Sequence, residues 1–483
     1  MKKILNIVLG FIVLFSSCKD FDDINIDPSK LSSAPTKSLL TYSLQRVSNP
    51  IWGRGDSVAY EQHGNYYVQY LSEGPYPGSS LYNVRNTNWD VYFVRPLNNL
   101  QTIINYNTED NPLADPGING SKNNQIAVAR ILKAYYFWTM TDRYGDIPYS
   151  EALKGNGNFT PKYDQQKDIY YDLFKELKEA AAQINESEQG VSGDILLGGD
   201  MAAWKKFANT TRLYMALRLI KNDYAKGQQE FTDALSSGVL ASNADNVVYQ
   251  FIAGDPNNYN PWFIDYSVDN RNDYAVSTTL TNYMQPKGDP RLPLYAEVLP
   301  GNVIKGLPYG SSAPLNIPLA YSRIGSYFRS AGSPAFIYTY PQTLFTLAEA
   351  AKVGYIPGGD AQAATYYADA IKASFEMYGV LGDATPYTAY MSQPGVAYNP
   401  ATGLQQIITE KWVHQYLNGF ESWTDWRRTG FPVLTPAEDA VQADIPRRMG
   451  YPVTEPSINN ESYQEAVARQ GPDDTNTRMW WDK

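Results

Sequence analysis

Apolar side chains recur at three- and four-residue spacing in several long stretches of the chain, which predicts amphipathic or buried helices. A buried helix is expected around Ile126–Trp138, ending at Gly145 because Pro148 follows closely. Further helices are expected over these stretches: 169–184, 204–217, 344–351, 366–375 and 404–416.

The expected helices follow one another in pairs, which is typical of helical-hairpin repeats such as the tetratricopeptide. The strict signature of that repeat, roughly 34 residues long, is absent. The sequence therefore predicts a mainly α fold built from degenerate hairpins, mainly at about 125–240 and 340–430.

Two stretches lack this periodicity and are rich in turn residues. They cover about 50–93 and 240–335, and the second contains many Asn, Pro, Gly and Tyr residues. A long irregular insertion inside a compact protein is usually functional. We expect these stretches to form a large, loop-rich lobe that carries a ligand-binding surface.

The first residues of the chain have the pattern of an export signal. Lys2 and Lys3 precede a short apolar run, and Ser16, Ser17 and Cys18 follow. The run is too short to span a bilayer comfortably, since a spanning helix needs about 20 apolar residues. We expect 1–17 to be a signal peptide and 38–483 to be a single composite unit.

Cys18 is the only cysteine of the chain, and its setting resembles the lipobox of bacterial lipoproteins. Phe15 stands where Leu is usual, so an ordinary secretory signal with a stray cysteine is the alternative interpretation. The acidic residues after Lys19 are similar to the surface-export tag of Bacteroidetes lipoproteins. We expect 18–37 to be an acylated cysteine followed by a tether.

The composition of the chain disfavours several kinds of ligand and of catalytic activity. The formal net charge of −10 disfavours nucleic acid and makes polyanionic ligands less favourable, although it leaves room for a local basic pocket. Only two histidines are present, His63 and His414, and both fit structural roles better than catalytic or metal-binding ones. No P-loop, dinucleotide fingerprint, HExxH or GxSxG motif occurs. We expect no cofactor, no metal site and no enzymatic activity, with a carboxylate-pair glycosidase as the alternative.

Aromatic residues indicate the expected ligand surface. Tyr outnumbers Phe 39 to 17, and a Tyr ring offers a flat apolar face with a polar hydroxyl. In the first irregular stretch, turns at Gly74-Pro75 and Pro77-Gly78 place aromatic and polar side chains on loops. The candidate ligand residues there are Tyr76, Tyr82, Arg85, Asn88 and Trp89. For Trp89, packing at the start of the next helix is an equally good interpretation.

In the second irregular stretch, rings alternate with amides, carboxylates and a guanidinium. The candidates there are Tyr259, Trp262, Asp265, Tyr266, Arg271, Tyr274 and Tyr327. Rings can cover the apolar C–H faces of a sugar while polar groups bind its hydroxyls. Both stretches therefore favour binding of a sugar without chemistry.

Several motifs resemble those of one family in order along the chain. The segment Ala134–Ala152 (AYYFWTMTDRYGDIPYSEA) is similar to the first-repeat motif of SusD/RagB-type nutrient-binding outer-membrane lipoproteins. The later matches are Trp204–Asn209 with Arg212 and Arg218, Leu347–Ala351, Lys411-Trp412, Gly419–Pro432, Ile445–Pro452 and Trp480–Asp482. Within Gly419–Pro432, Arg427 and Arg428 beside acids and tryptophans favour a buried ion-pair centre; binding of an anionic ligand is the alternative.

The resemblance implies a lipid-anchored protein of the outer membrane that faces the cell exterior and has about four tetratricopeptide-like hairpins. It implies a SusC-like TonB-dependent transporter as partner, over which the protein lies as a lid. It also implies capture of oligosaccharides without chemistry. A peptide-binding RagB-like member is the alternative within the family, and a surface glycoside hydrolase is the alternative from another class.

Overall fold

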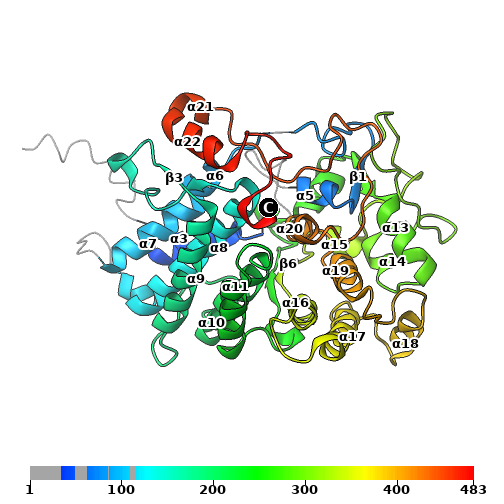
Figure 1. Cartoon of the computed structure of the whole chain (residues 1–483), viewed down its shortest axis with the longest axis horizontal. Coiled ribbons are helices and arrows are strands. Elements are labelled where there is room, and N and C mark those ends of the chain that lie inside the picture. Colours follow the sequence, from blue (N-terminus) through cyan, green and yellow to red (C-terminus); the bar gives the residue numbers. More distant parts are fainter. Residues whose placement is uncertain (1–33, 49–61, 85, 109–115) are drawn as a thin grey trace, which may run out of the picture.

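A computed structural model describes residues 34–48, 62–84, 86–108 and 116–483 of the chain. The described residues are mainly helical (Figure 1), which confirms the predicted fold class. The expected signal peptide, Cys18, most of the tether and Arg85 lie outside these residues. Within the described ranges, no helix is both long and apolar enough to cross a membrane.

Helical hairpins form the scaffold and lie side by side along the long axis of the molecule (Figure 1). The paired helices are α8 (Lys122–Tyr144) with α9 (Gln166–Gln183), α10 (Met201–Arg218) with α11 (Tyr224–Ser236), α16 (Tyr340–Val353) with α17 (Gly359–Met377), and the shorter α19 (Gly403–His414) with α20 (Gly419–Thr429). Each predicted helix is present, and each begins before the apolar stretch that predicted it. At their C-terminal ends, α9 stops one residue and α19 two residues before the predicted stretch ends.

The remaining helices are shorter. They are α3 (Thr36–Gln45), α5 (His63–Tyr67), α6 (Asp90–Tyr92), η2 (Phe93–Leu97), α7 (Asn98–Thr108), η3 (Pro116–Asn119), η4 (Gly155–Gly157), η5 (Asn243–Asp245), η6 (Pro256–Asn258), α12 (Pro261–Phe263), η7 (Ile264–Val268), α13 (Thr278–Met284), η8 (Gln285–Lys287), α14 (Leu292–Tyr295), α15 (Ser326–Arg329), α18 (Thr385–Met391), α21 (Glu455–Ile458), α22 (Asn460–Gln470) and η9 (Trp480–Asp482).

The long helix α8 shows how the sequence sets both ends of a helix. The Ser121 hydroxyl accepts a hydrogen bond from the Asn124 N–H at 3.2 Å and caps the first turn. At the other end Gly145 has φ +83°, and its N–H donates to the Thr141 carbonyl at 2.8 Å. A Cβ at Gly145 would lie 1.7 Å from Oε1 of Gln470, so glycine also lets α22 approach this end.

Short two-stranded sheets join segments that are far apart in sequence. The antiparallel pairs are β1 (Leu71–Glu73) with β5 (Tyr274–Val276), β2 (Ile147–Pro148) with β3 (Tyr163–Asp164), and β4 (Val247–Tyr249) with β6 (Ala335–Tyr338). In the first sheet Leu71 pairs with Val276 and Glu73 with Tyr274. This sheet brings the two irregular stretches of the sequence together.

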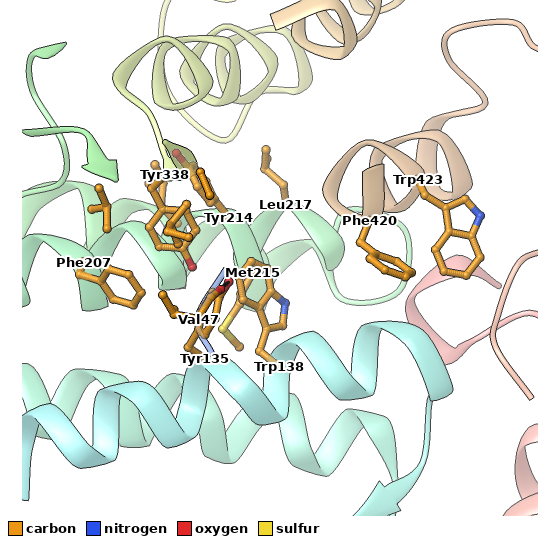
Figure 2. Packing of buried hydrophobic residues seen from close by; sticks show 14 of the residues in the cluster. Val47, Tyr135, Trp138, Phe207, Tyr214, Met215, Leu217, Tyr338, Phe420 and Trp423 are labelled. Carbon is orange, nitrogen blue, oxygen red and sulfur yellow. Dashed lines mark hydrogen bonds between the residues drawn. The ribbon is translucent and has the colours of Figure 1, made fainter. Parts of the chain in front are cut away.

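One aromatic core runs through the helical scaffold. Figure 2 shows Tyr135 and Trp138 of α8 beneath Phe207 of α10 and Tyr338 of β6. The ring centroids of Tyr135 and Phe207 are 5.8 Å apart, and those of Phe207 and Tyr338 are 4.9 Å apart. Buried residues from Leu40 to Trp481 belong to this cluster, so both ends of the described chain share it.

An ion-pair centre lies inside the protein around α20, as the sequence predicts for Arg427 and Arg428. Nη2 of Arg428 lies 2.6 Å from Glu349 of α16 and 2.6 Å from Asp425. Lys411 Nζ lies 2.9 Å from Asp425. Burial alone would raise the pKa of Asp425, but the charges of Lys411 and Arg428 hold it well below its usual range.

Arg427 has a different role from its neighbour. Its guanidinium stacks on Trp423 at 3.6 Å and on Trp481 at 4.7 Å from the ring centroids. Its Nη1 donates to the Asp142 carbonyl at 2.8 Å. Both arginine side chains are buried, so this centre holds α20 to the C-terminal residues and to α16 and presents no surface for an anionic ligand.

Candidate ligand-binding site

The structure buries half of the predicted ligand residues. These are Tyr82, Trp89, Trp262, Asp265, Tyr266 and Tyr274. The sequence places these residues on loops and hence at the surface. For Trp89, burial confirms the alternative of packing at the start of the next helix. For the other five the expectation of exposure is wrong, because neighbouring side chains and elements cover them. Their large rings therefore point into the core, where burial of apolar area stabilises the loops.

The other predicted residues within the described part of the chain are accessible, but they lie in different places. Tyr76 is 70% exposed, Asn88 and Arg271 are also exposed, and Tyr259 and Tyr327 are half-buried. Tyr327 packs against Phe328 and Tyr378, at centroid distances of 5.0 and 5.8 Å. Of the predicted ligand contacts, Tyr76, Arg271 and Tyr259 are therefore the ones most accessible to a ligand.

The buried residues of the middle insertion form a network beneath its surface loops. The Tyr274 hydroxyl donates to Asp265 Oδ2 at 2.6 Å, and the Tyr266 hydroxyl donates to the Tyr274 carbonyl at 2.8 Å. Trp262 meets Tyr274 edge to face at 5.4 Å. Burial raises the pKa of Tyr274 well above its ordinary value, so its hydroxyl stays a hydrogen-bond donor. These side chains position the loops and do not themselves face a ligand.

Three neighbouring loops, 74–79, 269–273 and 311–321, meet above this network, and we call them the rim loops. The Gly74 N–H donates to the Asp273 carbonyl at 2.8 Å, and the Leu315 N–H donates to the Gly74 carbonyl at 3.3 Å. Arg271 Nε donates to Asp273 at 2.6 Å. The rim loops thus place Tyr76 and Arg271, predicted from separate stretches, on loops that are bonded to each other.

Glu73 closes the rim loop that carries Tyr76. Its Oε2 accepts the N–H groups of Ser79 and Ser80 at 2.7 and 2.8 Å. Burial raises the pKa of the Glu73 carboxyl from 4.5 to about 7, although the two N–H donors oppose this shift. The conformation of this loop is therefore coupled to a carboxyl group that titrates near neutral pH.

A concave site lies around Tyr259, and we call it the Tyr259 pocket. Its volume is about 450 Å³. It is lined by Gln45, Arg46, Ser48, Tyr249, Phe251, Asn257, Asn258, Tyr259, Pro261 and Ile264. The lining combines aromatic rings, side-chain amides and one guanidinium, which is the composition the sequence predicts for a sugar site. Three segments supply it: the end of α3, the strand β4 and the loop that leads into α12.

Local hydrogen bonds fix the walls of the Tyr259 pocket. The Tyr249 hydroxyl donates to Asn258 Oδ1 at 2.9 Å, and the Tyr249 and Phe251 rings meet at 4.9 Å. Tyr259 packs edge to face on Phe263 at 5.1 Å. The Asn260 side chain accepts the Trp262 N–H at 2.8 Å and so starts α12 directly after Tyr259.

Arg46, Tyr249 and Phe251 were not predicted as ligand residues from the sequence. Arg46 lies at the end of α3, and about 200 residues separate it from Tyr249. An arginine next to a helix end has an ordinary local explanation, and no periodic pattern links the two segments. Only the folded chain shows that they line one pocket.

A second cavity of about 430 Å³ has a different character. Trp89 lies in its wall with Phe93 and Leu153, and Val94, Phe159 and Ile458 are exposed beside it. Its accessible lining is more apolar than that of the Tyr259 pocket, although Asn98, Lys154, Asn158, Glu455 and Asn459 also line it. It matches a sugar ligand less well than the Tyr259 pocket does.

The two histidines do not share a site. His63 is buried against Tyr67, with the ring centroids 5.9 Å apart. His414 is buried between Thr339 and Ser374, and burial lowers its pKa well below the ordinary value. In the described part of the chain, no group of three or more His, Cys, Asp or Glu side chains is placed to hold a metal ion.

The sequence of this chain matches a known protein family over most of its length. A SusD-like family model, described as "Starch-binding associating with outer membrane", matches residues 28–452. None of the curated proteins compared with the chain matches it.

Solved structures match over nearly the whole chain. One is described as a chitin-binding protein, with 29% identity, a TM-score of 0.75 and coverage of 92% of this chain and 99% of its own. A chitin-binding SusD homologue from Flavobacterium johnsoniae has 25% identity, a TM-score of 0.76 and coverage of 92% and 98%. A SusD homologue from Bacteroides uniformis has 25% identity, a TM-score of 0.75 and coverage of 92% and 99%.

Proposed function

Because this chain belongs to the SusD-like family of outer-membrane-associated proteins, we propose that it captures oligosaccharides at the cell surface and delivers them intact to a SusC-like TonB-dependent transporter. The Tyr259 pocket is the observation that carries this proposal. Its rings can stack on the faces of sugar rings, and its amides can bind hydroxyls. The chitin-binding descriptions of two similar structures also favour a glycan as ligand.

The rim loops supply a second contact in this proposal. Tyr76 is largely exposed and Arg271 projects from a neighbouring loop, so an extended ligand could meet both. Asn88 and Tyr327 lie apart from these loops, and we assign them no contact. Binding alone needs no acid–base pair, which agrees with the separation of the two histidines.

Calorimetric titration of the mature protein with a panel of oligosaccharides tests the proposal. We expect binding of some members without release of new reducing ends. Tyr259→Ala should weaken that binding about two- to tenfold, because an aromatic contact contributes about 0.5–1.5 kcal/mol. Tyr76→Ala should weaken binding of longer members more than that of short ones.

Phe159→Ala is the matched control, since this ring is 79% exposed and does not line the Tyr259 pocket. It should leave affinity unchanged. Release of reducing ends would support a glycoside hydrolase instead, and binding of peptides alone would support a RagB-like role.

Anchoring through Cys18 is a separate part of the proposal. Acylation of Cys18 with two or more chains would hold the protein stably at the membrane. Cys18→Ser should abolish lipid labelling and release the protein from the outer-membrane fraction, as measured by fractionation and by protease access on whole cells. Unchanged surface display of this variant would contradict lipid anchoring.

A further inference from the structure

We propose that the ligand of the Tyr259 pocket carries a carboxylate that pairs with Arg46, so that the glycan contains an acidic sugar residue. This inference rests on the proposed function and adds a substrate class to it. Among the described residues, Arg46 is the only charged side chain that lines the pocket. Among the described residues, no carboxylate lies within ion-pair distance of its guanidinium.

The state of Arg46 differs from that of three buried arginines in this protein. Arg212, Arg291 and Arg428 each pair with carboxylates, at 2.8 Å (Glu230), 2.7 Å (Asp289) and 2.6 Å (Glu349) respectively. Shielding a guanidinium from water costs free energy unless hydrogen bonds replace the lost solvent. At those three arginines a carboxylate compensates the buried charge, whereas none of the described carboxylates does so at Arg46.

The contacts of Arg46 are weak. Its guanidinium lies 5.1 Å from the centroid of the Tyr42 ring, and Nη2 is 3.4 Å from the Tyr42 hydroxyl. Its Nε is shielded from solvent and has no hydrogen-bond partner among the described residues. The side chain is half-buried, so a ligand can reach the remaining N–H groups.

The other polar groups of the pocket also favour a ligand group that accepts hydrogen bonds. Asn258 Oδ1 is occupied by the Tyr249 hydroxyl, which leaves its Nδ2 donors available toward a ligand. Asp255, the acid next to this segment, does not line the pocket, and its Oδ1 accepts the Asn257 N–H at 3.0 Å. A carboxylate matches the planar fork of a guanidinium and accepts two hydrogen bonds from it.

The acidity of the whole chain limits how many charges the ligand carries. With a formal net charge of −10, the protein repels polyanions at long range. The pocket offers one guanidinium, so one carboxylate per bound segment is the favoured arrangement. A neutral glycan with an occasional uronic acid residue fits this better than a densely charged polymer.

The test compares neutral oligosaccharides with counterparts in which one C6 hydroxymethyl group is oxidised to a carboxylate, so that linkage and length stay equal. We expect the carboxylate member of at least one pair to bind about tenfold more tightly. Arg46→Gln should remove this preference, and Arg46→Lys should retain part of it. Raising NaCl from about 0.05 to about 0.5 M should reduce the preference in the unmodified protein.

Arg478→Gln is the matched control, because Arg478 is an exposed arginine that lines neither the Tyr259 pocket nor the rim loops and already pairs with Asp482 at 3.3 Å. It should keep the preference, and thermal unfolding should show that each variant is folded. Binding of neutral members with no gain from the carboxylate would overturn this inference and leave the proposed function standing. Failure of every member to bind would contradict the proposed function as well.

Discussion

At the scale of single residues, Trp262 shows that a loop context does not place a ring at the surface. The residue lies in a Pro- and Asn-rich stretch, yet its side chain is 0% exposed and packs on Tyr274. The α12 turn, capped by Asn260, directs the ring inward. Tyr76 follows a similar turn-rich segment and remains 70% exposed. The local sequence does not distinguish the two rings.

Replacement of Trp262 should therefore act on stability. We expect Trp262→Ala to lower the free energy of unfolding by about 3–5 kcal/mol, because it removes a buried ring and leaves a cavity. Tyr76→Ala should change it by less than about 0.5 kcal/mol. Urea unfolding followed by fluorescence or circular dichroism measures both. A folded Trp262→Ala protein of unchanged stability would show that the ring is not part of the core.

At the scale of elements, the turn after β1 is held by a carboxylate, Glu73, whose protonation changes near neutral pH. Glu73 accepts two N–H groups across the turn, and burial raises its pKa to about 7. The unfolded chain loses this proton near pH 4.5, whereas the folded chain keeps it until about pH 7. The folded state thus binds more protons in this window, so stability should fall as pH rises from about 5 to about 7.

Glu73→Gln should remove this part of the pH dependence, because glutamine keeps the acceptor oxygen and does not titrate. Thermal unfolding between pH 5 and 8 measures it. The Tm of the unmodified protein should decline relative to that of the variant as pH rises. Parallel curves for the two proteins would show that Glu73 does not titrate differently in the folded state.

At the scale of the whole molecule, the buried ion-pair centre joins α16, α19 and α20, and Arg218 of α10 lies 3.7 Å from Asp425 in the same centre. Arg428 of α20 pairs with Glu349 of α16, and Asp425 of the same helix pairs with Lys411 of α19. Helix α20, which carries Asp425 and Arg428, lies beside the C-terminus in the middle of the molecule (Figure 1). Because the charges are removed from water, each needs its partner.

Glu349→Gln should lower the free energy of unfolding by about 3–5 kcal/mol, since it leaves part of the buried Arg428 charge uncompensated. Glu179→Gln is the control: this carboxylate pairs with Arg130 at 3.0 Å but is 49% exposed, and its loss should cost no more than about 1 kcal/mol. Chemical unfolding of both variants measures the difference. Equal losses would mean that burial does not decide the strength of these pairs.

The order of the motifs also places the molecule within its family before any coordinates are considered. The matched family model spans 28–452, which agrees with a resemblance that runs through most of the chain. The division into a signal, a tether and one composite unit stays a prediction, since the first of these boundaries lie outside the described residues.

The sequence by itself determined the helices, their pairing and the family, because apolar periodicity, caps and glycine stops act over a few residues. It also indicated a sugar-type composition in the irregular stretches. Only the tertiary structure decided which rings face solvent and which segments meet. Trp262 and Tyr274 are buried by neighbours distant in sequence, and Arg46 reaches Tyr249 across about 200 residues. Such contacts depend on the packing of the whole chain, and no local pattern encodes them.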